Sequence, residues 1–300
     1  PDLIWWKCRN SAKNHGLTDA VRGNTKIIRS NESSVESTDS TYIQSFDSDG
    51  TTIGSNGNIN SNGDTFCLWN WKANGAGSAN TNGDIASTVS ANTTSGFSIV
   101  SWTANGSNNA TIGHGLSSTP KIVLYKKLND VDSWYAVYTF VDGTQDYVVL
   151  NDTNAKADLA SGTYGTATST TISNIGFPNS SSLIAYCFAD VQGYSKFGKF
   201  IGNGNADGTF VYTGFKPAFV IQKQSSASGE YWMMKDNKRE TGNQTDANLY
   251  PNANNAEGDT NGIDLLSNGF KCRTSGAGSN GSGATYIYMA FAEAPLVGTN

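Results

Sequence analysis

Seven tryptophans are the residues of this chain whose type and spacing best suit ligand binding. Trp134 and Trp232 lie 14 and 15 residues after two matching prolines. The adjacent Trp5 and Trp6 must point to opposite faces of a strand. Aromatic rings hold sugars by stacking and apolar contact, so Trp5, Trp134 and Trp232 are candidate ligand-binding residues. Packing between strands explains the same residues with nothing bound, and it is the favoured alternative.

Residue types that serve catalysis or metal binding form no recognisable pattern. The Gly-x-Ser-x-Gly and His-Glu-x-x-His motifs are absent. His15 and His114 are the only histidines, and we expect them at the surface or in turns. Residues 203–208 resemble the first half of a calcium loop, but an Asn/Asp/Gly turn explains them with nothing bound. We expect no catalytic centre, metal or cofactor. A pair of carboxylates for glycoside hydrolysis is still an alternative, because such a pair is defined by its separation in space and not by its spacing in the sequence.

Composition narrows the class of protein. Charged residues make up 15% of the chain and the net charge is −5, so electrostatic capture of nucleic acid or of an anionic membrane is not expected. No apolar run reaches membrane-spanning length, and no secretory signal is present. The chain starts at Pro1 without a Met, which favours a fragment or a processed product. The four cysteines are widely spaced and favour free thiols, with a Cys8–Cys67 bridge as the alternative.

The aromatic residues belong to a motif that occurs three times. Its closing segments place Trp71, Phe188 and Phe291 in matching positions, which we expect to be equivalent and buried. Each copy opens with a Pro, a run of apolar or aromatic residues and a Lys at the same offset. The distance from that Pro to the closing aromatic is 70, 68 and 74 residues. The opening and closing segments are 1–7 with 66–71, 120–126 with 183–190, and 217–223 with 286–293.

Further residues repeat between the opening and closing segments, in the same order. Each copy has an Asn followed by an acid, and two copies also share an Asp-x-x-Arg pair, which we interpret as a local ion pair that fixes a turn. This matched order indicates an internal repeat. The residues are Asn31, Asn151 and Asn252, then Glu36, Asp158 and Glu257, with Asp19–Arg22 and Asp236–Arg239.

Turn signals and alternation predict an all-β fold. Nine Asn-Gly and three Asp-Gly dipeptides favour tight hairpin turns. We expect three small antiparallel β-sandwich units of lectin or jelly-roll type. Additional strands are expected at 97–102, before Pro120, at 197–201 and at 209–212. The expected organisation is a first repeat at 1–72, a linker or surface loop at 73–96, a second repeat at 97–190 and a third repeat at 191–300.

The first repeat begins at its Pro and so lacks the two strands that precede this position in the other copies. An unpaired strand edge would follow, and such edges are normally covered. Upstream sequence, a neighbouring chain or residues 73–96 are the possible sources of cover. We favour the first two because 73–96 is poor in strand-forming residues, and we expect the strand from Leu3 to Trp6 to have an open side.

The chain resembles the Gly/Asn-rich virion proteins of tailed phages that infect marine bacteria, including cyanobacteria. The resemblance covers nearly the whole chain. The segments that carry it are 71–78, 80–84, 113–116, 186–190, 214–217, 266–271 and 286–293.

This resemblance implies a structural protein of the virion, assembled in the host cytoplasm. The lack of a nucleophile–base constellation in the sequence separately predicts that the protein is not an enzyme. It most resembles a tail fibre or spike component that recognises a host surface glycan. The alternative is a capsid decoration or tail connector protein with a purely structural role. The implied partners are other copies of the chain as a homotrimer, other virion proteins and host glycan, without nucleic acid or membrane insertion. The loop at 73–96 is a candidate for part of the trimer contact.

Overall fold

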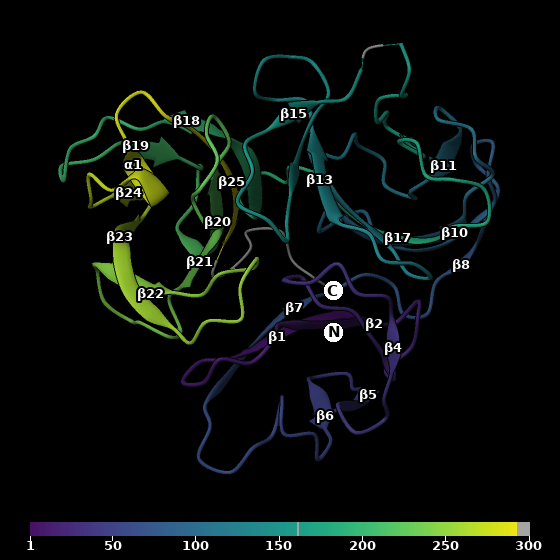
Figure 1. Cartoon of the computed structure of the whole chain (residues 1–300), viewed down its shortest axis with the longest axis horizontal. Coiled ribbons are helices and arrows are strands. Elements are labelled where there is room, and N and C mark those ends of the chain that lie inside the picture. Colours follow the sequence, from purple (N-terminus) through teal and green to yellow (C-terminus); the bar gives the residue numbers. More distant parts are fainter. Residues whose placement is uncertain (161, 293–300) are drawn as a thin grey trace.

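The computed structural model describes residues 1–160 and 162–292, and these residues are almost entirely β-structure. Three lobes surround a common centre (Figure 1). Lobe one contains β1 to β7, lobe two β8 to β17, and lobe three β18 to β25 with the short helix α1 (Ala277–Asn280). The all-β, antiparallel and sandwich-like character predicted from the sequence is confirmed. No helix among the described residues is long and apolar enough to span a membrane.

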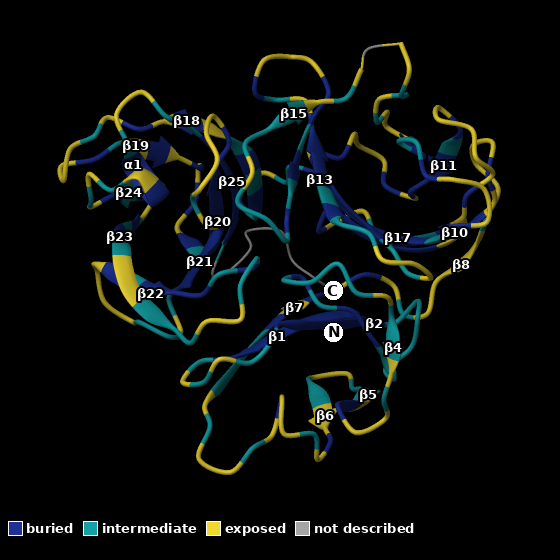
Figure 2. Ribbon diagram, viewed as in Figure 1, coloured by how far each residue is buried: buried dark blue, intermediate teal, exposed yellow. Residues whose placement is uncertain are grey.

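Each lobe contributes one inner sheet, and central strands of these sheets are buried on both faces, as Figure 2 shows for β1 (Leu3–Cys8) and β17 (Ser182–Phe188). The three inner sheets, in spatial order, contain the following strands. Lobe one has β2 (Gly16–Asp19), β1 (Leu3–Cys8) and β7 (Phe66–Trp71); lobe two has β15 (Ala157–Asp158), β14 (Asp146–Val149), β13 (Trp134–Tyr138), β12 (Ile122–Lys127), β17 (Ser182–Phe188), β10 (Phe97–Thr103), β9 (Ser87–Asn92) and β8 (Ser78–Asn80); lobe three has β18 (Ser195–Ile201), β25 (Thr285–Ala292), β20 (Pro217–Gln224) and β21 (Met233–Asp236).

Smaller outer sheets cover the inner sheets on the side away from the centre, so each lobe has its own core. The outer strands are β3 (Lys26–Ile27) with β4 (Ser37–Thr38) and β5 (Ile43–Phe46) with β6 (Thr51–Ile53) in lobe one; β11 (Thr111–Gly113) with β16 (Thr171–Ser173) in lobe two; and β19 (Phe210–Tyr212), β24 (Gly269–Cys272), β23 (Gly258–Leu266) and β22 (Thr245–Asn248) in lobe three. The strands expected near 97–102, before Pro120, near 197–201 and near 209–212 are therefore present as β10, β11, β18 and β19.

The three closing aromatics meet at the centre of the molecule. Trp71, Phe188 and Phe291 are buried, and their ring centroids lie 5.7 to 6.1 Å apart in edge-to-face pairs. Each is the antiparallel partner of the residue two positions after its opening Pro, in the pairs Leu3–Trp71, Ile122–Phe188 and Phe219–Phe291. The expected equivalence of these buried aromatics is confirmed. A single apolar cluster joins the inner faces of all three lobes.

Two expectations about the chain before the second repeat are wrong. Residues 73–96 are not a strand-free linker, because β8 and β9 lie within them and extend the sheet of lobe two beyond β10. Val89 is buried in the core of lobe two. Near the edge of an existing sheet, one buried β-branched residue among small polar residues is enough to form a strand, because the neighbouring strand already provides the pairing partner. The strand β1 is paired on both sides, with β2 and with β7.

Candidate functional site

The tryptophans expected to bind a ligand are all buried. Trp5, Trp134 and Trp232 have exposed fractions of 2%, 0% and 1%. The indole N–H of Trp134 donates to the carbonyl of Arg29 in lobe one at 2.9 Å, and that of Trp232 donates to Val149 in lobe two at 3.0 Å. Buried rings cannot stack on a ligand from solution, so the platform hypothesis is wrong for these residues. All three pack between strands, and Trp134 and Trp232 also join neighbouring lobes.

The repeated asparagines hold these positions in place. The side-chain carbonyl of Asn151 accepts the backbone N–H of Trp134, and that of Asn252 accepts the N–H of Trp232. In lobe one, Asn31 accepts the N–H of His15 in the same way, at 2.9 Å. A histidine therefore occupies in lobe one the place that tryptophan occupies in the other two lobes.

Both histidines are buried, and the expectation that they lie at the surface is wrong. His15 accepts the indole N–H of Trp5 at 2.9 Å. His114 accepts the backbone N–H of Leu116. Burial lowers the pKa of both imidazoles, which keeps them neutral at pH 7. Their contacts are those of structural residues that pack inside the fold.

The repeated Asp-x-x-Arg pairs are ion pairs that fix turns, as predicted. Asp19 and Arg22 are 2.6 Å apart, and Asp236 and Arg239 are also 2.6 Å apart. The arginines extend to Glu36 and Glu257, respectively, the acids that repeat in the sequence.

A ring from a second lobe completes each of these ionic groups. The hydroxyl of Tyr186 in lobe two donates to Asp19 at 2.8 Å, and the indole N–H of Trp69 in lobe one donates to Asp236 at 3.1 Å. The two aspartates thus serve as buried polar joints between lobes.

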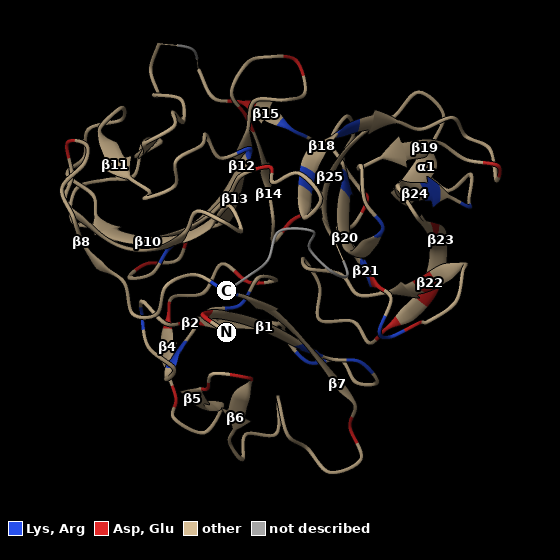
Figure 3. Ribbon diagram, turned by 180° about the vertical axis from the view of Figure 1, so that it is seen from behind, with Lys and Arg blue, Asp and Glu red and all other residues tan. Residues whose placement is uncertain are grey.

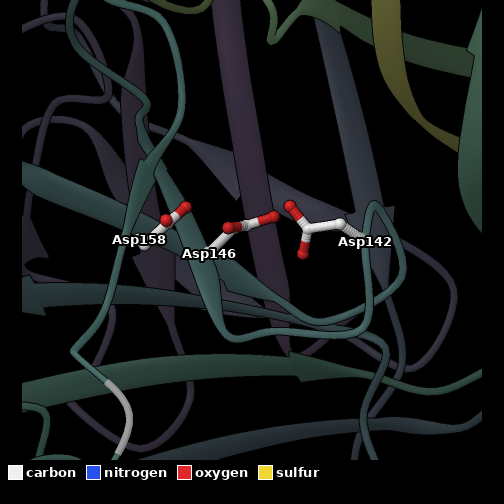
Figure 4. A group of neighbouring side chains, drawn as sticks. All are labelled: Asp142, Asp146 and Asp158. Carbon is white, nitrogen blue, oxygen red and sulfur yellow. The ribbon is translucent and has the colours of Figure 1, made fainter.

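One group of acids among the described residues has the spacing of a cation site. Asp142, Asp146 and Asp158 lie close together (Figure 4). The ammonium of Lys156 contacts all three, at 2.9, 2.8 and 2.8 Å. Although burial opposes it, hydrogen bonding to these carboxylates raises the pKa of Lys156, and burial raises the pKa of Asp146. The lysine charge therefore stands where a metal ion would sit.

Residues 203–208, which resemble half a calcium loop, form a turn through their own side chains. Asn203 accepts the backbone N–H of Asn205 and the side-chain N–H of Asn280. Asp207 pairs with Lys271 at 2.7 Å. These oxygens are already engaged in bonds within the fold, as the favoured interpretation of a plain Asn/Asp/Gly turn requires.

The strand β19 carries two exposed aromatic residues that are not among the candidates predicted from the sequence. Phe210 and Tyr212 have exposed fractions of 44% and 66%, while Val211 between them is buried in the core of lobe three. The two rings share one face because alternate residues of a strand point to the same side. Ile201 is also exposed, and its carbonyl accepts the hydroxyl of Thr209 at the start of β19. We call the surface formed by Ile201, Phe210 and Tyr212 the β19 face.

The neighbouring strand β24 places a glycine and a charged side chain beside the β19 face. Gly269 lies opposite Tyr212, and Lys271 lies opposite Phe210. A Cβ atom on Gly269 would come within 3.0 Å of the Phe210 ring, so the glycine allows this ring to lie against the sheet. Lys271 on β24 and Arg273 directly after this strand supply basic residues, and acidic residues mark β22 and β23 (Figure 3). The surface combines exposed rings with hydrogen-bonding groups.

The sequence contained a signal for the β19 face. The segment Phe210-Val-Tyr212 alternates large residues, and a strand with one apolar face can bury either the aromatics or the valine. The structure buries the valine and leaves both aromatic residues exposed.

Comparison with known proteins identifies the family but not the activity. No curated protein and no solved structure matches this chain. One family model matches residues 1–295, which is nearly the whole chain. The chain therefore belongs to the family described as Domain of unknown function (DUF7483).

Proposed function

We propose that this chain is a structural protein of a phage virion, of the tail fibre or spike type, and that it binds a glycan on the host surface through the β19 face. Its resemblance in sequence to Gly/Asn-rich virion proteins supports the particle role. The observation that carries the binding role is the pair of exposed rings, Phe210 and Tyr212, on a regular strand. The chain acts by holding its ligand and not by transforming it.

The chemistry of the β19 face suits a sugar. The apolar face of a pyranose packs against an aromatic ring, while its hydroxyls need donors and acceptors at the rim. Tyr212 supplies the more exposed ring. Lys271, Arg273 and Asp264 supply charged hydrogen-bonding groups on the adjacent strands. A rigid sheet holds these groups in place before the ligand arrives, which reduces the entropy lost on binding.

The binding role is tested by the Tyr212→Ala and Phe210→Ala variants. Loss of one stacked ring costs about 0.5–1.5 kcal/mol, so we expect each variant to weaken binding to host cells or to a host polysaccharide by roughly 2- to 13-fold. Tyr231→Ala, which removes another exposed tyrosine of lobe three, is the matched control and should bind as the parent does. Binding by both β19 variants at parental affinity would refute the role of this face.

A capsid decoration or tail connector role is the second candidate. Ile201 adds aliphatic surface to the β19 face, and a protein neighbour covers such surface more fully than a sugar does. A reconstruction of the particle distinguishes the two. The β19 face would be covered by another virion protein in a connector and open to solvent at the tip of a fibre.

Self-association as a homotrimer is part of the same proposal and rests on the resemblance alone. The segment 73–96 remains the candidate contact, although Val89 and Ser90 are already buried within the chain and only its exposed residues are available. Light scattering on the purified chain tests this proposal. A monomer at micromolar concentration would contradict it.

A further inference from the structure

The same backbone hydrogen bond joins each pair of neighbouring lobes, so the three lobes form a closed ring (Figure 1). In every case an N–H near the repeated acid of one lobe donates to the carbonyl eight residues after the opening Pro of the next lobe. The bonds run from Glu36 to Leu128 at 2.9 Å, from Lys156 to Ser225 at 2.8 Å and from Glu257 to Arg9 at 2.6 Å. The interface between lobes one and three, which we call the one–three interface, is therefore built like the other two.

A second contact repeats at the interfaces, but with a different side chain at the one–three interface. The indoles of Trp134 and Trp232 donate across the other two interfaces, each to a carbonyl two residues before a repeated asparagine. At the one–three interface, His15 occupies the position of these tryptophans, and the backbone of Tyr250, two residues before Asn252, lies against its imidazole. An imidazole can take up a proton in mildly acidic solution, whereas an indole cannot.

The imidazole of His15 is held by a hydrogen bond that a proton would remove. Its Nδ1 accepts the indole N–H of Trp5 at 2.9 Å, and a protonated imidazole has no acceptor nitrogen. The Trp5 ring packs edge to face against Trp69 at 6.4 Å, and Trp69 in turn donates to Asp236 of lobe three. Protonation of His15 therefore disturbs the buried contacts that hold lobe three against lobe one.

The charges around His15 oppose a charge on its ring. Burial lowers the pKa of His15 well below its usual value, and the positive charges of Lys7 and Arg239 lower it further. A cavity of about 50 Å³ adjoins the ring. The titratable residues around the imidazole are Lys7 of β1, Arg239 after β21, Arg29 and Tyr42 at this cavity, and Glu32, which pairs with Arg29 at 3.8 Å.

The acids of the one–three interface keep their charge in mildly acidic solution. Although burial opposes it, hydrogen bonds from Arg9 and Arg239 lower the pKa of Glu257. Although burial opposes it, the charge of Arg239 also lowers the pKa of Asp236. A change of charge at this interface between about pH 6.5 and pH 5 therefore falls on His15.

We propose that the one–three interface is an acid-sensitive contact: protonation of His15 breaks its bond to Trp5 and opens the ring between the first and last lobes, while the other two interfaces stay closed. Lobes one and three are not consecutive in the chain, so they can separate without stretching a connection. Opening would separate the Trp69 ring of lobe one from Phe219 of lobe three, whose centroids lie 5.6 Å apart.

The direction of the effect follows from the state that binds the proton more readily. An exposed imidazole has a pKa of about 6.5, and the buried one has a lower pKa, so the open form binds more protons. The closed form is therefore fully stable above about pH 6.5 and loses stability as the pH falls below this value. The ratio of open to closed molecules should rise by up to about tenfold per pH unit.

Hydrogen exchange at the three equivalent amides tests the proposal in the full chain. Protection is the exchange rate relative to that of an unstructured peptide at the same pH. Between about pH 6.5 and pH 5, the protection of the Glu257 amide should fall by about tenfold. The amides of Glu36 and Lys156, which make the same bond at the other two interfaces, should change by less than about twofold.

Two variants remove the titrating group. His15→Asn places a carbonyl oxygen near the position of Nδ1, so it can still accept the N–H of Trp5, and it should abolish the fall in protection at Glu257. The double variant Trp5→Leu, His15→Trp gives lobe one the pair that lobe two has in Leu124 and Trp134, and it should abolish the fall as well.

His114→Asn is the matched control, because His114 is also buried and its pKa is also lowered by burial. The hydrogen bonds of His114 are to Leu116 and Thr168, both in lobe two, so this variant should keep the parental response at Glu257.

Three results would overturn the proposal. An equal loss of protection at all three amides would indicate acid unfolding of the whole chain. A loss at Glu257 that persists in both His15 variants would assign the response to another group. Unchanged protection at Glu257 down to about pH 5 would show that the one–three interface stays closed in this range.

Discussion

Replacing Phe188 with alanine should weaken all three lobes at once, because its ring lies where they meet. Its centroid is 6.1 Å from Trp71, 5.9 Å from Phe291 and 4.9 Å from Phe97. The residue is 3% exposed and lies in the apolar cluster common to the lobes. Truncation therefore removes contacts within lobe two and between lobe two and both neighbours.

The expected loss is about 3–5 kcal/mol in the free energy of unfolding, the range for truncating a buried phenylalanine. The upper half of the range applies here, since the surrounding rings belong to strands of different sheets and cannot easily move in to fill the space. Phe188→Leu keeps most of the volume and should cost less, about 1–2 kcal/mol.

Urea unfolding followed by tryptophan fluorescence and by far-ultraviolet circular dichroism measures these losses. Phe210→Ala is the control, because Phe210 is 44% exposed and its loss should stay within about 0.5 kcal/mol. The two probes should shift together in Phe188→Ala if the lobes unfold as a unit. A loss below about 1 kcal/mol for Phe188→Ala, or equal losses in the two variants, would refute the assignment of this ring to a shared core.

Three further predictions follow from buried charges. Burial lowers the pKa of Lys7, Lys126 and Lys223 to about 8. The folded chain therefore binds fewer protons than the unfolded chain between about pH 8 and 10. The free energy of unfolding should rise from pH 8 to 9 by up to about 1.4 kcal/mol per lysine. Lys126→Met should reduce this slope, and a slope that this variant leaves unchanged would contradict the assignment. Burial raises the pKa of the Cys67, Cys187 and Cys272 thiols to about 12, so these thiols oppose part of the rise once the unfolded thiols ionise, from about pH 8 upward. Arg239→Met leaves Asp236 buried without its partner and should lower the free energy of unfolding by about 3–5 kcal/mol. The control Lys127→Met removes a pair with the exposed Asp130 and should lower it by under about 1 kcal/mol. Similar urea midpoints for the two variants would argue against a buried ion pair between lobes. Millimolar calcium or EDTA should leave the melting temperature of the parent chain unchanged, because the ammonium of Lys156 lies among the three aspartates. A rise in melting temperature with calcium that is lost in Asp146→Asn would show instead that a cation displaces the lysine.

Local spacing determined the strands and much of their register. A Pro followed by an apolar run, with an aromatic about 70 residues later, appears three times, and the structure pairs Leu3 with Trp71, Ile122 with Phe188 and Phe219 with Phe291. Turn dipeptides and alternation are local properties, so they can be read from the chain. The Asp-x-x-Arg ion pairs could also be predicted, because their partners lie three residues apart.

The roles of the repeated polar residues required the structure. Asn31, Asn151 and Asn252 were visible as a pattern, but the pattern did not indicate that each accepts a backbone N–H from a residue at or just before the start of a neighbouring strand. The partner lies 16 or more residues away in the chain, and that distance is closed only when the sheet forms.

Tertiary structure alone decided which side of each strand is covered. Alternation shows that Trp5 and Trp6 lie on opposite faces and that Phe210 and Tyr212 share one, but it does not show where other sheets lie. The inner sheets are covered on both faces, so Trp5, Trp134 and Trp232 are buried, whereas the outer sheet of lobe three leaves Phe210 and Tyr212 in solvent. Among the residues that the structure describes, β7 pairs with β1 alone, and this too was hidden in the sequence, because strand order in a sheet depends on contacts between residues far apart in the chain.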